Sequence, residues 1–244
     1  MTDIIFTKTF SVPDEYSPKP ADKYVPDWYK NLESYFGGEK KPSGDGQTTG
    51  TIKRCMPVFD AITGGYVIPT YVDIFVSQRE IFDAATNEPT GKKFPWYEWP
   101  SFSPLGFHPI EQAPAHPNRK ELISEAQYTK WHNPWSIKTP KGYSCLFLPP
   151  MHRDNIMTIF PGVVDTDTYT LNVEFPFMLT EPTFNGLIPA GTPIAQVIPF
   201  KRDSWSMNMG GEKEVQEGLK IQRSLLSRYY HVYKDKYRVK KEYK

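Results

Sequence analysis

The chain has 244 residues, enough for one large domain or for one domain with an appended arm. Its formal net charge of +1 argues against a protein that coats nucleic acid and against an acidic, solvating chain. Aromatic residues make up 15% of the sequence and prolines number 24, a composition that favours short strands, turns and irregular loops over a helical bundle.

Neither the cysteines nor the apolar segments indicate export or membrane insertion. The two cysteines, Cys55 and Cys145, are far apart and form no CxxC pair, so we expect neither a zinc ribbon nor a disulfide scaffold. No apolar run approaches the roughly 18 residues that a membrane span needs. The first residues, MTDIIFTKTF, lack the basic region and apolar stretch of a secretion signal. We therefore expect a soluble, cytoplasmic protein without membrane contact.

Residues 1–50 are expected to form an irregular, extended N-terminal arm. Prolines at positions 13, 18, 20 and 26 interrupt it, and only Asp27–Phe36 has the spacing of a short helix, with Trp28, Leu32 and Tyr35 on one face. Residues 37–50 (GGEKKPSGDGQTTG) predict a turn-rich surface loop. They do not predict a phosphate-binding loop, because no Lys-Ser or Lys-Thr pair follows the glycines.

Residues 51–211 are expected to form a mostly β core domain. In residues 51–79, β-branched and aromatic residues flank a turn at Gly64 and Gly65, and Tyr71–Val76 has the length of a strand. Residues 94–117 are rich in proline and predict irregular or edge structure. Between Asn118 and Trp131 we expect a short helix with Asn118 as its N-cap.

Residues 136–202 form the most strand-like part of the sequence. We expect strands at Gly142–Leu148, near Thr158–Val164, at Tyr169–Phe175 and at Ile194–Phe200, with a turn at residues 189–191. Connections this short favour an antiparallel core, either a distorted β-barrel of the β-clip type or a jelly-roll-like sheet, over a parallel βαβ sheet. The fold class expected is therefore mainly β.

Residues 212–244 are expected to form one long amphipathic helix with a basic outer face. The segment contains ten basic residues and five acidic ones, and apolar or aromatic residues recur at positions 215, 219, 226, 230, 233 and 237. Tyrosines interleaved with basic residues could contact nucleic acid. We favour instead that the tyrosines pack on the body or on a neighbouring subunit, while the lysines complement the helix dipole. Nucleic acid is not an expected partner.

The segment Lys141–Arg202 contains the residues that indicate chemistry. Its sequence PGVVDTDTY (161–169) predicts a strand that leads into a turn, with Asp165 and Asp167 two positions apart. If the strand continues, alternation places both carboxylates on one side, where they can hold a water molecule or a divalent ion such as Mg²⁺. If it ends there, the Asp and Thr side chains cap the amides of an ordinary turn. The spacing leaves both interpretations open.

The order of the motifs resembles that of the dUTPase and dCTP-deaminase superfamily. The sequence GVVD (162–165) is followed by a tyrosine and, about twenty residues later, by a glycine turn and IAQ (194–196). In that superfamily a GVID-type motif at a strand end precedes an aromatic residue, a glycine turn and an IAQ strand. The resemblance implies a β-clip fold and a homo-oligomer, with a trimer expected, because such proteins build their sites between subunits.

The resemblance assigns roles to individual residues. Asp165 matches the aspartate that orients the attacking water, and Tyr169 matches the aromatic residue that stacks on the deoxyribose. Glu174 lies near the position of the catalytic glutamate of the deaminase branch. The other nucleotide-binding candidates are Arg153, Asp167, Gln196 and Lys201. Of these, Arg153 or Lys201 is expected to bind the phosphates.

Several features depart from the family pattern. The place of the phosphate-binding Arg-Ser-Gly motif holds PMHR (150–153), the tyrosine comes one residue late, and no glycine-rich closing arm follows at the usual distance. More faintly, Met56–Ile74 is similar to the family's opening strand motif. Residues 131–205 are also similar to an uncharacterised family of bacterial and tailed-phage proteins. That second resemblance implies a phage or bacterial origin, and hence the host cytoplasm or a virion as the location.

A rival site overlaps these motifs. His152-Arg153-Asp154 is an HxD triplet, which places a histidine and a carboxylate on the same side of a strand. Non-haem Fe(II) oxygenases use such a pair with a distal histidine. The histidine downstream, His231, falls in the expected C-terminal helix, a poor place for a third ligand. His108, His116 and His132 are expected to be hydrogen-bonded structural residues.

Three functions follow from these observations. The first is a divergent dUTPase- or dCTP-deaminase-like protein that binds a nucleotide and hydrolyses or deaminates it. The second is a non-enzymatic structural or interaction protein, such as a phage virion component, that keeps the β scaffold without the phosphate motifs. The third is the Fe(II) oxygenase that uses the triplet at 152–154. The partner is accordingly a nucleotide or another protein.

Overall fold

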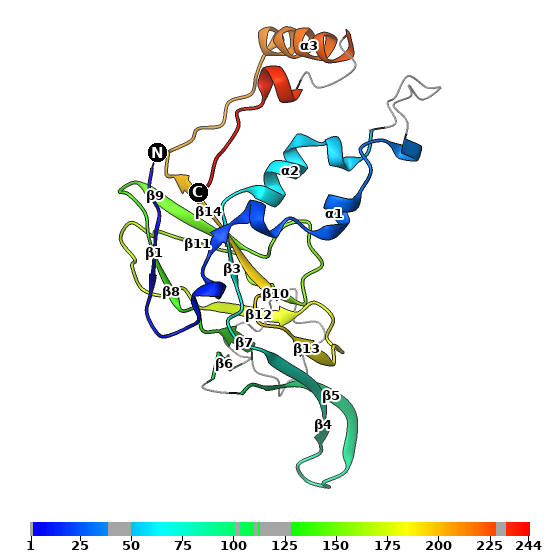
Figure 1. Ribbon diagram of the computed structural model, residues 1–244, viewed down its shortest axis with the longest axis vertical. Helices are drawn as coiled ribbons and strands as arrows, with labels where there is room; N and C mark the ends of the chain where they lie inside the picture. Colours follow the sequence, from blue (N-terminus) through cyan, green and yellow to red (C-terminus); the bar gives the residue numbers. More distant parts are fainter. Residues whose placement is uncertain (1, 39–49, 101–102, 110–111, 113–127, 228–232) are drawn as a thin grey trace.

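The computed structural model describes residues 2–38, 50–100, 103–109, 112, 128–227 and 233–244 (Figure 1). The expectation of a mainly β, antiparallel fold is confirmed, since every strand pair in these ranges is antiparallel. The strands are β1 (Ile5–Lys8), β2 (Lys19–Pro20), β3 (Tyr66–Pro69), β4 (Ile74–Phe82), β5 (Pro89–Glu98), β6 (Leu105–His108), β7 (Tyr128–Trp131), β8 (Trp135–Lys138), β9 (Tyr143–Leu148), β10 (Met157–Ile159), β11 (Gly162–Val164), β12 (Phe175–Leu179), β13 (Gly186–Ile188) and β14 (Pro193–Lys201).

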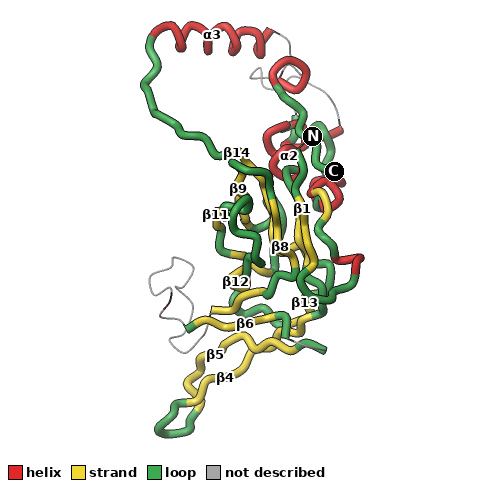
Figure 2. Tube along the Cα trace, turned by 90° about the vertical axis from the view of Figure 1, so that its left-hand side faces the viewer, coloured by secondary structure: helices red, strands yellow, loops and turns green. Residues whose placement is uncertain are grey.

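The strands of the described ranges make four sheets. The largest has the order β11-β9-β14-β3-β2, and a second has the order β10-β12-β7-β6. A third, β13-β4-β5, extends into the long β4–β5 hairpin that projects at one end of the molecule (Figure 2). The fourth is the pair β1-β8. The two larger sheets both contribute residues that line the groove described below.

The core joins the two larger sheets and also includes buried residues of the other two. Trp131 and Phe177 from one sheet and Phe147 from the other are almost completely buried. The rings of Phe147 and Phe175 lie 5.7 Å apart, which joins β9 to the start of β12. Burial of these rings removes large apolar areas from water and so stabilises the packing of the two sheets.

The structure bears out several of the expected strands and overturns one. The segments at Gly142–Leu148 and Ile194–Phe200 are β9 and β14, and the stretch near Thr158–Val164 contains β10 and β11. The strand expected at Tyr169–Phe175 is wrong, because only Phe175 belongs to a strand, β12. The carbonyl of Asp165 accepts hydrogen bonds from the amides of Thr168 and Tyr169 at 3.0 and 2.8 Å, so the chain turns there.

The first half of the core differs more from expectation. Met56–Thr63 is a helix, α2, with a proline in its first turn, where an opening strand motif was expected. The strand expected at Tyr71–Val76 begins at Ile74 as β4. Of the helix expected at 118–131, residues 118–127 lie outside the described residues and Tyr128–Trp131 is β7. The proline-rich segment does carry edge strands, β5 and β6, as expected.

The N-terminal segment is not a free arm. β1 pairs with β8 and β2 pairs with β3, so two of its segments are incorporated into sheets. The expected helix is shorter, α1 (Asp27–Asn31), and most of the turn-rich loop, residues 39–49, lies outside the described residues. Val12, Ala21 and Tyr29 are buried, which shows that the segment contributes to the core. Short 3-10 helices lie at Asp14–Tyr16, Ala21–Tyr24, Phe36–Gly38 and Ile52–Arg54.

The C-terminal segment forms a projecting helix and a returning strap instead of one continuous helix. The helix α3 (Glu212–Ser227) lies away from the body, and a π-helical turn at Tyr233–Tyr237 follows it (Figure 1). The chain then returns to the body, where Arg238 pairs with Asp60 at 2.6 Å and Tyr243 packs edge-on against Tyr66. Among the described residues no helix is long and apolar enough to cross a membrane.

Candidate functional site

An open groove of about 790 Å³ lies between the outer face of the β10-β12-β7-β6 sheet and β11 with the turn that follows it. Three residues that the sequence analysis named as site candidates, Asp165, Tyr169 and Glu174, line this groove together. Its lining residues are His108, Lys130, Val163, Val164, Asp165, Tyr169, Asn172, Val173 and Glu174.

Strand alternation explains why one wall of the groove is polar. In β7, Thr129 and Trp131 are buried, so Lys130 and the next residue but one, His132, lie on the opposite, outer face. The pairing of Phe175 with Trp131 places Glu174 across from His132 on that same face. The outer face of the sheet therefore carries Lys130 and Glu174, which line the groove, and His132, which lies next to them but is not a lining residue. The inner face of the sheet builds the core.

The closest polar contact on this wall joins His132 and Glu174. The Nδ1 atom of His132 lies 2.6 Å from Oε2 of Glu174, and both side chains are about one-third exposed. Such a distance is typical of a charge-assisted hydrogen bond. His132 was expected to be a hydrogen-bonded structural residue, and the bond is present. What the sequence did not reveal is its partner, which lies 42 positions away in the chain.

A glycine in β6 provides the space that these side chains occupy. Gly106 pairs with Lys130 in the sheet register. A Cβ atom at Gly106 would lie 2.7 Å from Cε of Lys130 and 2.9 Å from Nε2 of His132. Any larger residue would therefore displace one side chain or both. The two side chains lie over the same point of the sheet, so the positive charge of Lys130 lies beside the His132 ring.

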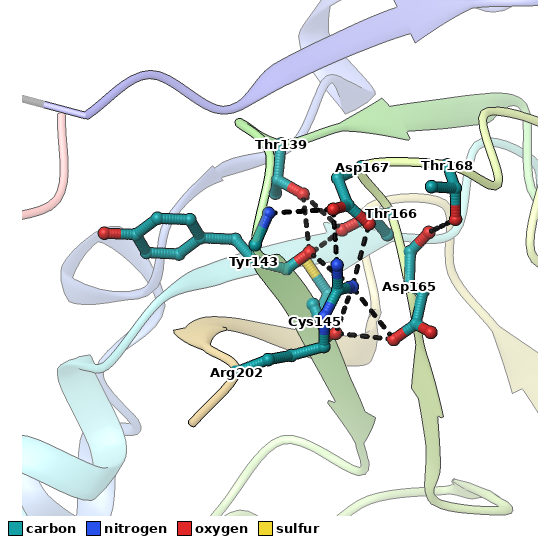
Figure 3. A network of polar contacts seen from close by, with 10 residues as sticks. Thr139, Tyr143, Cys145, Asp165, Thr166, Asp167, Thr168 and Arg202 are labelled. Carbon is teal, nitrogen blue, oxygen red and sulfur yellow. Dashed lines mark hydrogen bonds and ion pairs between the residues drawn. The ribbon is translucent and has the colours of Figure 1, made fainter. Parts of the chain in front are cut away.

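On the opposite wall, Asp165 belongs to a polar network centred on Arg202 (Figure 3). Oδ1 of Asp165 accepts a hydrogen bond from Oγ of Ser144 at 2.6 Å and lies 3.1 Å from Nη1 of Arg202. Its side chain is still 59% exposed, so part of the carboxylate is accessible from the groove. Of the two interpretations of the Asp-Thr-Asp-Thr segment, the structure contains the turn, and the turn directs Asp165 toward the groove wall.

Asp167 lies deeper in the same network. Its side chain is only 3% exposed and accepts hydrogen bonds from both Nη atoms of Arg202, at 2.8 and 2.5 Å. The backbone amide of Gly142 donates a third, at 2.8 Å. These bonds join the end of β14, the start of β9 and the turn after β11. Because both carboxylate oxygens already accept hydrogen bonds from Arg202 and Gly142, we assign Asp167 a structural role in this wall of the groove.

This network makes a contribution to stability that depends on pH. The Arg202 guanidinium, with the Gly142 amide, lowers the pKa of Asp167 to about 2. The pKa in the unfolded chain is about 3.9, so the contribution is complete above about pH 4 and is lost as the pH falls toward 2. We expect Asp167→Asn to melt at lower temperature than the wild type at pH 7, with the difference shrinking between pH 4 and 2. Thermal melts across pH 7 to 2.5 measure this, and a difference that stays constant would contradict it.

Gln196 is buried and its amide is fully used inside the protein. Its Oε1 accepts a hydrogen bond from the Met151 amide at 2.9 Å. Its Nε2 donates to the carbonyls of Ala61 and Gly64 at 2.9 and 2.7 Å. The side chain thus holds β14 to the end of α2 and to the turn after β9, and it does not line the groove.

The two expected phosphate ligands lie elsewhere. Arg153 follows β9 and is half-buried near Tyr24 and Asp27, and burial lowers the pKa of its guanidinium. Lys201 is exposed at the end of β14, with Nζ 3.7 Å from Asp203. Neither lines the groove. The cation that the structure does place in the groove is Lys130, in a segment to which the sequence analysis assigned a helix.

The residues of the rival metal site are exposed and do not converge with other ligands. His152 and Asp154 lie on the surface after β9, and His152 has a positive φ of 54°. Within the described ranges, no three His, Cys, Asp or Glu side chains come together as a metal site would require. His231 lies outside the described residues.

Comparisons with models of known protein families and with curated protein sequences give no match.

Proposed function

We propose that this protein binds a nucleotide in the groove between β7 and β11 and hydrolyses or deaminates it. The observation that carries the proposal is the position of Asp165, Tyr169 and Glu174. These residues were selected from sequence motifs, and they line one groove of about 790 Å³. That volume lies within the range of about 300–1,000 Å³ that small-molecule sites occupy.

The chemistry of the lining suits a nucleotide. Tyr169 is 46% exposed, and its ring offers a face on which a base or sugar can stack. Val163 and Val164 add apolar surface beside it, and Lys130 at the other wall supplies a positive charge for phosphate oxygens. The exposed part of the Asp165 carboxylate can accept a hydrogen bond from a sugar hydroxyl or from a water molecule. The same carboxylate can instead bind a Mg²⁺ ion that also binds the phosphate oxygens of the nucleotide.

A thermal-shift panel tests the proposal on the full chain. It contains deoxynucleoside triphosphates and monophosphates, with and without Mg²⁺. A ligand at 100 times its Kd adds about 2.7 kcal/mol to the free energy of unfolding, which raises the melting temperature measurably. We expect at least one nucleotide to do so.

Tyr169→Ala is expected to weaken that binding by roughly 5- to 150-fold. Stacking of a base on an aromatic side chain contributes about 1–3 kcal/mol, and the variant removes the ring without altering the core. Titration of the nucleotide against the melting temperature measures the change. Tyr233→Ala is the matched control, because Tyr233 is also a tyrosine, 43% exposed, and lies outside the groove. Equal affinities for the two variants would contradict a role for Tyr169.

A separate observation favours an interaction protein as the second candidate function. Trp205, Met207 and Met209 are 90%, 89% and 89% exposed in the segment that leaves β14 toward α3. Their two-residue spacing places the side chains on one side of an extended chain. Exposed large apolar side chains that lie together are typical of contact surfaces, including those between copies of one chain. A panel without any shift would contradict nucleotide binding and would leave this interaction as the function to test.

A further inference from the structure

The pair His132 and Glu174 has the arrangement of a general base with an orienting carboxylate. Oε2 of Glu174 lies 2.6 Å from Nδ1 of His132. A carboxylate at that position favours a proton on Nδ1 and leaves the lone pair of Nε2 available. Within the described ranges, Nε2 has no hydrogen-bond partner. The imidazole is therefore held in one orientation with its basic nitrogen unused.

The surroundings of Nε2 suit an anionic substrate. Nε2 and the Lys130 side chain lie over the same point above Gly106, where a Cβ atom would meet both. Lys130 lines the groove, and in the described part of the chain no carboxylate pairs with it. A cation next to a base binds the oxygens of a phosphate group and stabilises the charge that develops on them during attack by water. The absence of a side chain at Gly106 leaves room for this arrangement.

We infer that His132, which lies beside the lining residues Lys130 and Glu174, acts as the general base for a substrate bound in the groove. We further infer that Glu174 is its positioning residue and that the reaction is hydrolysis of a phosphate ester or anhydride. The inference rests on the proposed nucleotide site and selects one of its two reactions. Lys130 binds the phosphate oxygens and Nε2 of His132 takes a proton from a water molecule. The water oxygen forms a bond to phosphorus as the bond from phosphorus to the leaving oxygen breaks. The proton on His132 then passes to that leaving oxygen.

The experiment measures release of phosphate and pyrophosphate from the nucleotides of the panel, beside their thermal shifts. His132→Gln is expected to lower kcat by about 100-fold or more, the usual contribution of a general base. Glu174→Gln keeps a hydrogen-bond partner for Nδ1 without the charge, so we expect kcat to fall about 10-fold or more with KM unchanged. Both variants should keep the thermal shift. Glu181→Gln, the same substitution at an exposed glutamate after β12, should keep full turnover.

Each outcome separates this inference from the proposed function. Nucleotide binding by the wild type without release of phosphate or pyrophosphate overturns the inference and leaves the binding site standing. Turnover at the wild-type rate in His132→Gln has the same consequence. A KM that rises in Glu174→Gln while kcat is unchanged assigns the glutamate to binding and overturns its positioning role. Absence of any nucleotide shift in the wild type overturns both proposals.

Discussion

Replacement of Gly65 by alanine is expected to lower the free energy of unfolding by more than about 4 kcal/mol or to prevent folding altogether. Gly65 has a φ of +72°, and a Cβ atom there would lie 2.0 Å from the carbonyl oxygen of Val197. That oxygen belongs to the backbone of β14, which is paired on both sides, with β3 and β9. The strand cannot move away without breaking the central part of the largest sheet.

Gly91→Ala is the matched control for this prediction. Gly91 has nearly the same φ, +73°, but no atom lies within 4 Å of the position its Cβ would take. The control therefore measures the cost of the left-handed backbone alone, about 1–2 kcal/mol. Urea denaturation of the two variants gives the difference that is due to contact with β14. Similar losses of stability in both variants would contradict the close approach of β3 and β14 at Gly65.

Trp131→Ala is expected to cost about 3–5 kcal/mol, because it removes a large, completely buried ring from the core. Trp131 pairs with Leu105 on one side and Phe175 on the other, and its ring lies 4.7 Å from that of Tyr71. For a chain of this length the change corresponds to a melting temperature lower by roughly 10 °C. Thermal denaturation at neutral pH measures it. Because Lys130 and His132 flank Trp131, we also expect this variant to bind nucleotide less well.

Trp131→Phe separates ring volume from hydrogen bonding. In the described part of the chain, Nε1 of Trp131 is buried without a hydrogen-bond partner. Phenylalanine deletes this unsatisfied donor, and the gain offsets part of the cost of the smaller ring. We expect the loss of stability to be less than half that of Trp131→Ala. An equal loss of stability in the two variants would contradict this expectation. It would show that Nε1 donates a hydrogen bond whose stabilising free energy exceeds the cost of burying the N–H group.

Local sequence signals predicted the strands whose bounds are marked by neighbouring turn residues. β9 and β14 were predicted because their β-branched and aromatic runs are bounded by glycine and proline. The turn at Asp165 was one of two interpretations left open, and the structure selects it. The helix α2 was missed because Val58, Phe59 and Ile62 favour strands as isolated residues. Its contacts with the N-terminal segment, such as the Tyr29–Phe59 stacking, are not visible in a local window.

The candidate site was predicted only in part, for a similar reason. Asp165, Tyr169 and Glu174 come from one continuous segment, so motifs along the chain were sufficient to select them. Lys130, in contrast, follows a segment with no recognisable motif and was assigned to a helix. Gln196 was selected from its motif, but the structure uses its amide to join β14 to α2. A motif reveals which residue is present, and packing decides which of its atoms remain available.

The sequence by itself determined the mainly β, antiparallel class and the positions of β9, β10, β11 and β14, and its motifs selected three of the residues that line the groove. These properties depend on alternation, turn chemistry and motif order, all of which are local. Only the tertiary structure decided that Glu174 meets His132 and that His132 and Lys130 lie above Gly106. These contacts depend on the pairing of β12 with β7 and of β7 with β6. Such pairings join distant segments through backbone hydrogen bonds and shared core burial, and no local pattern encodes them.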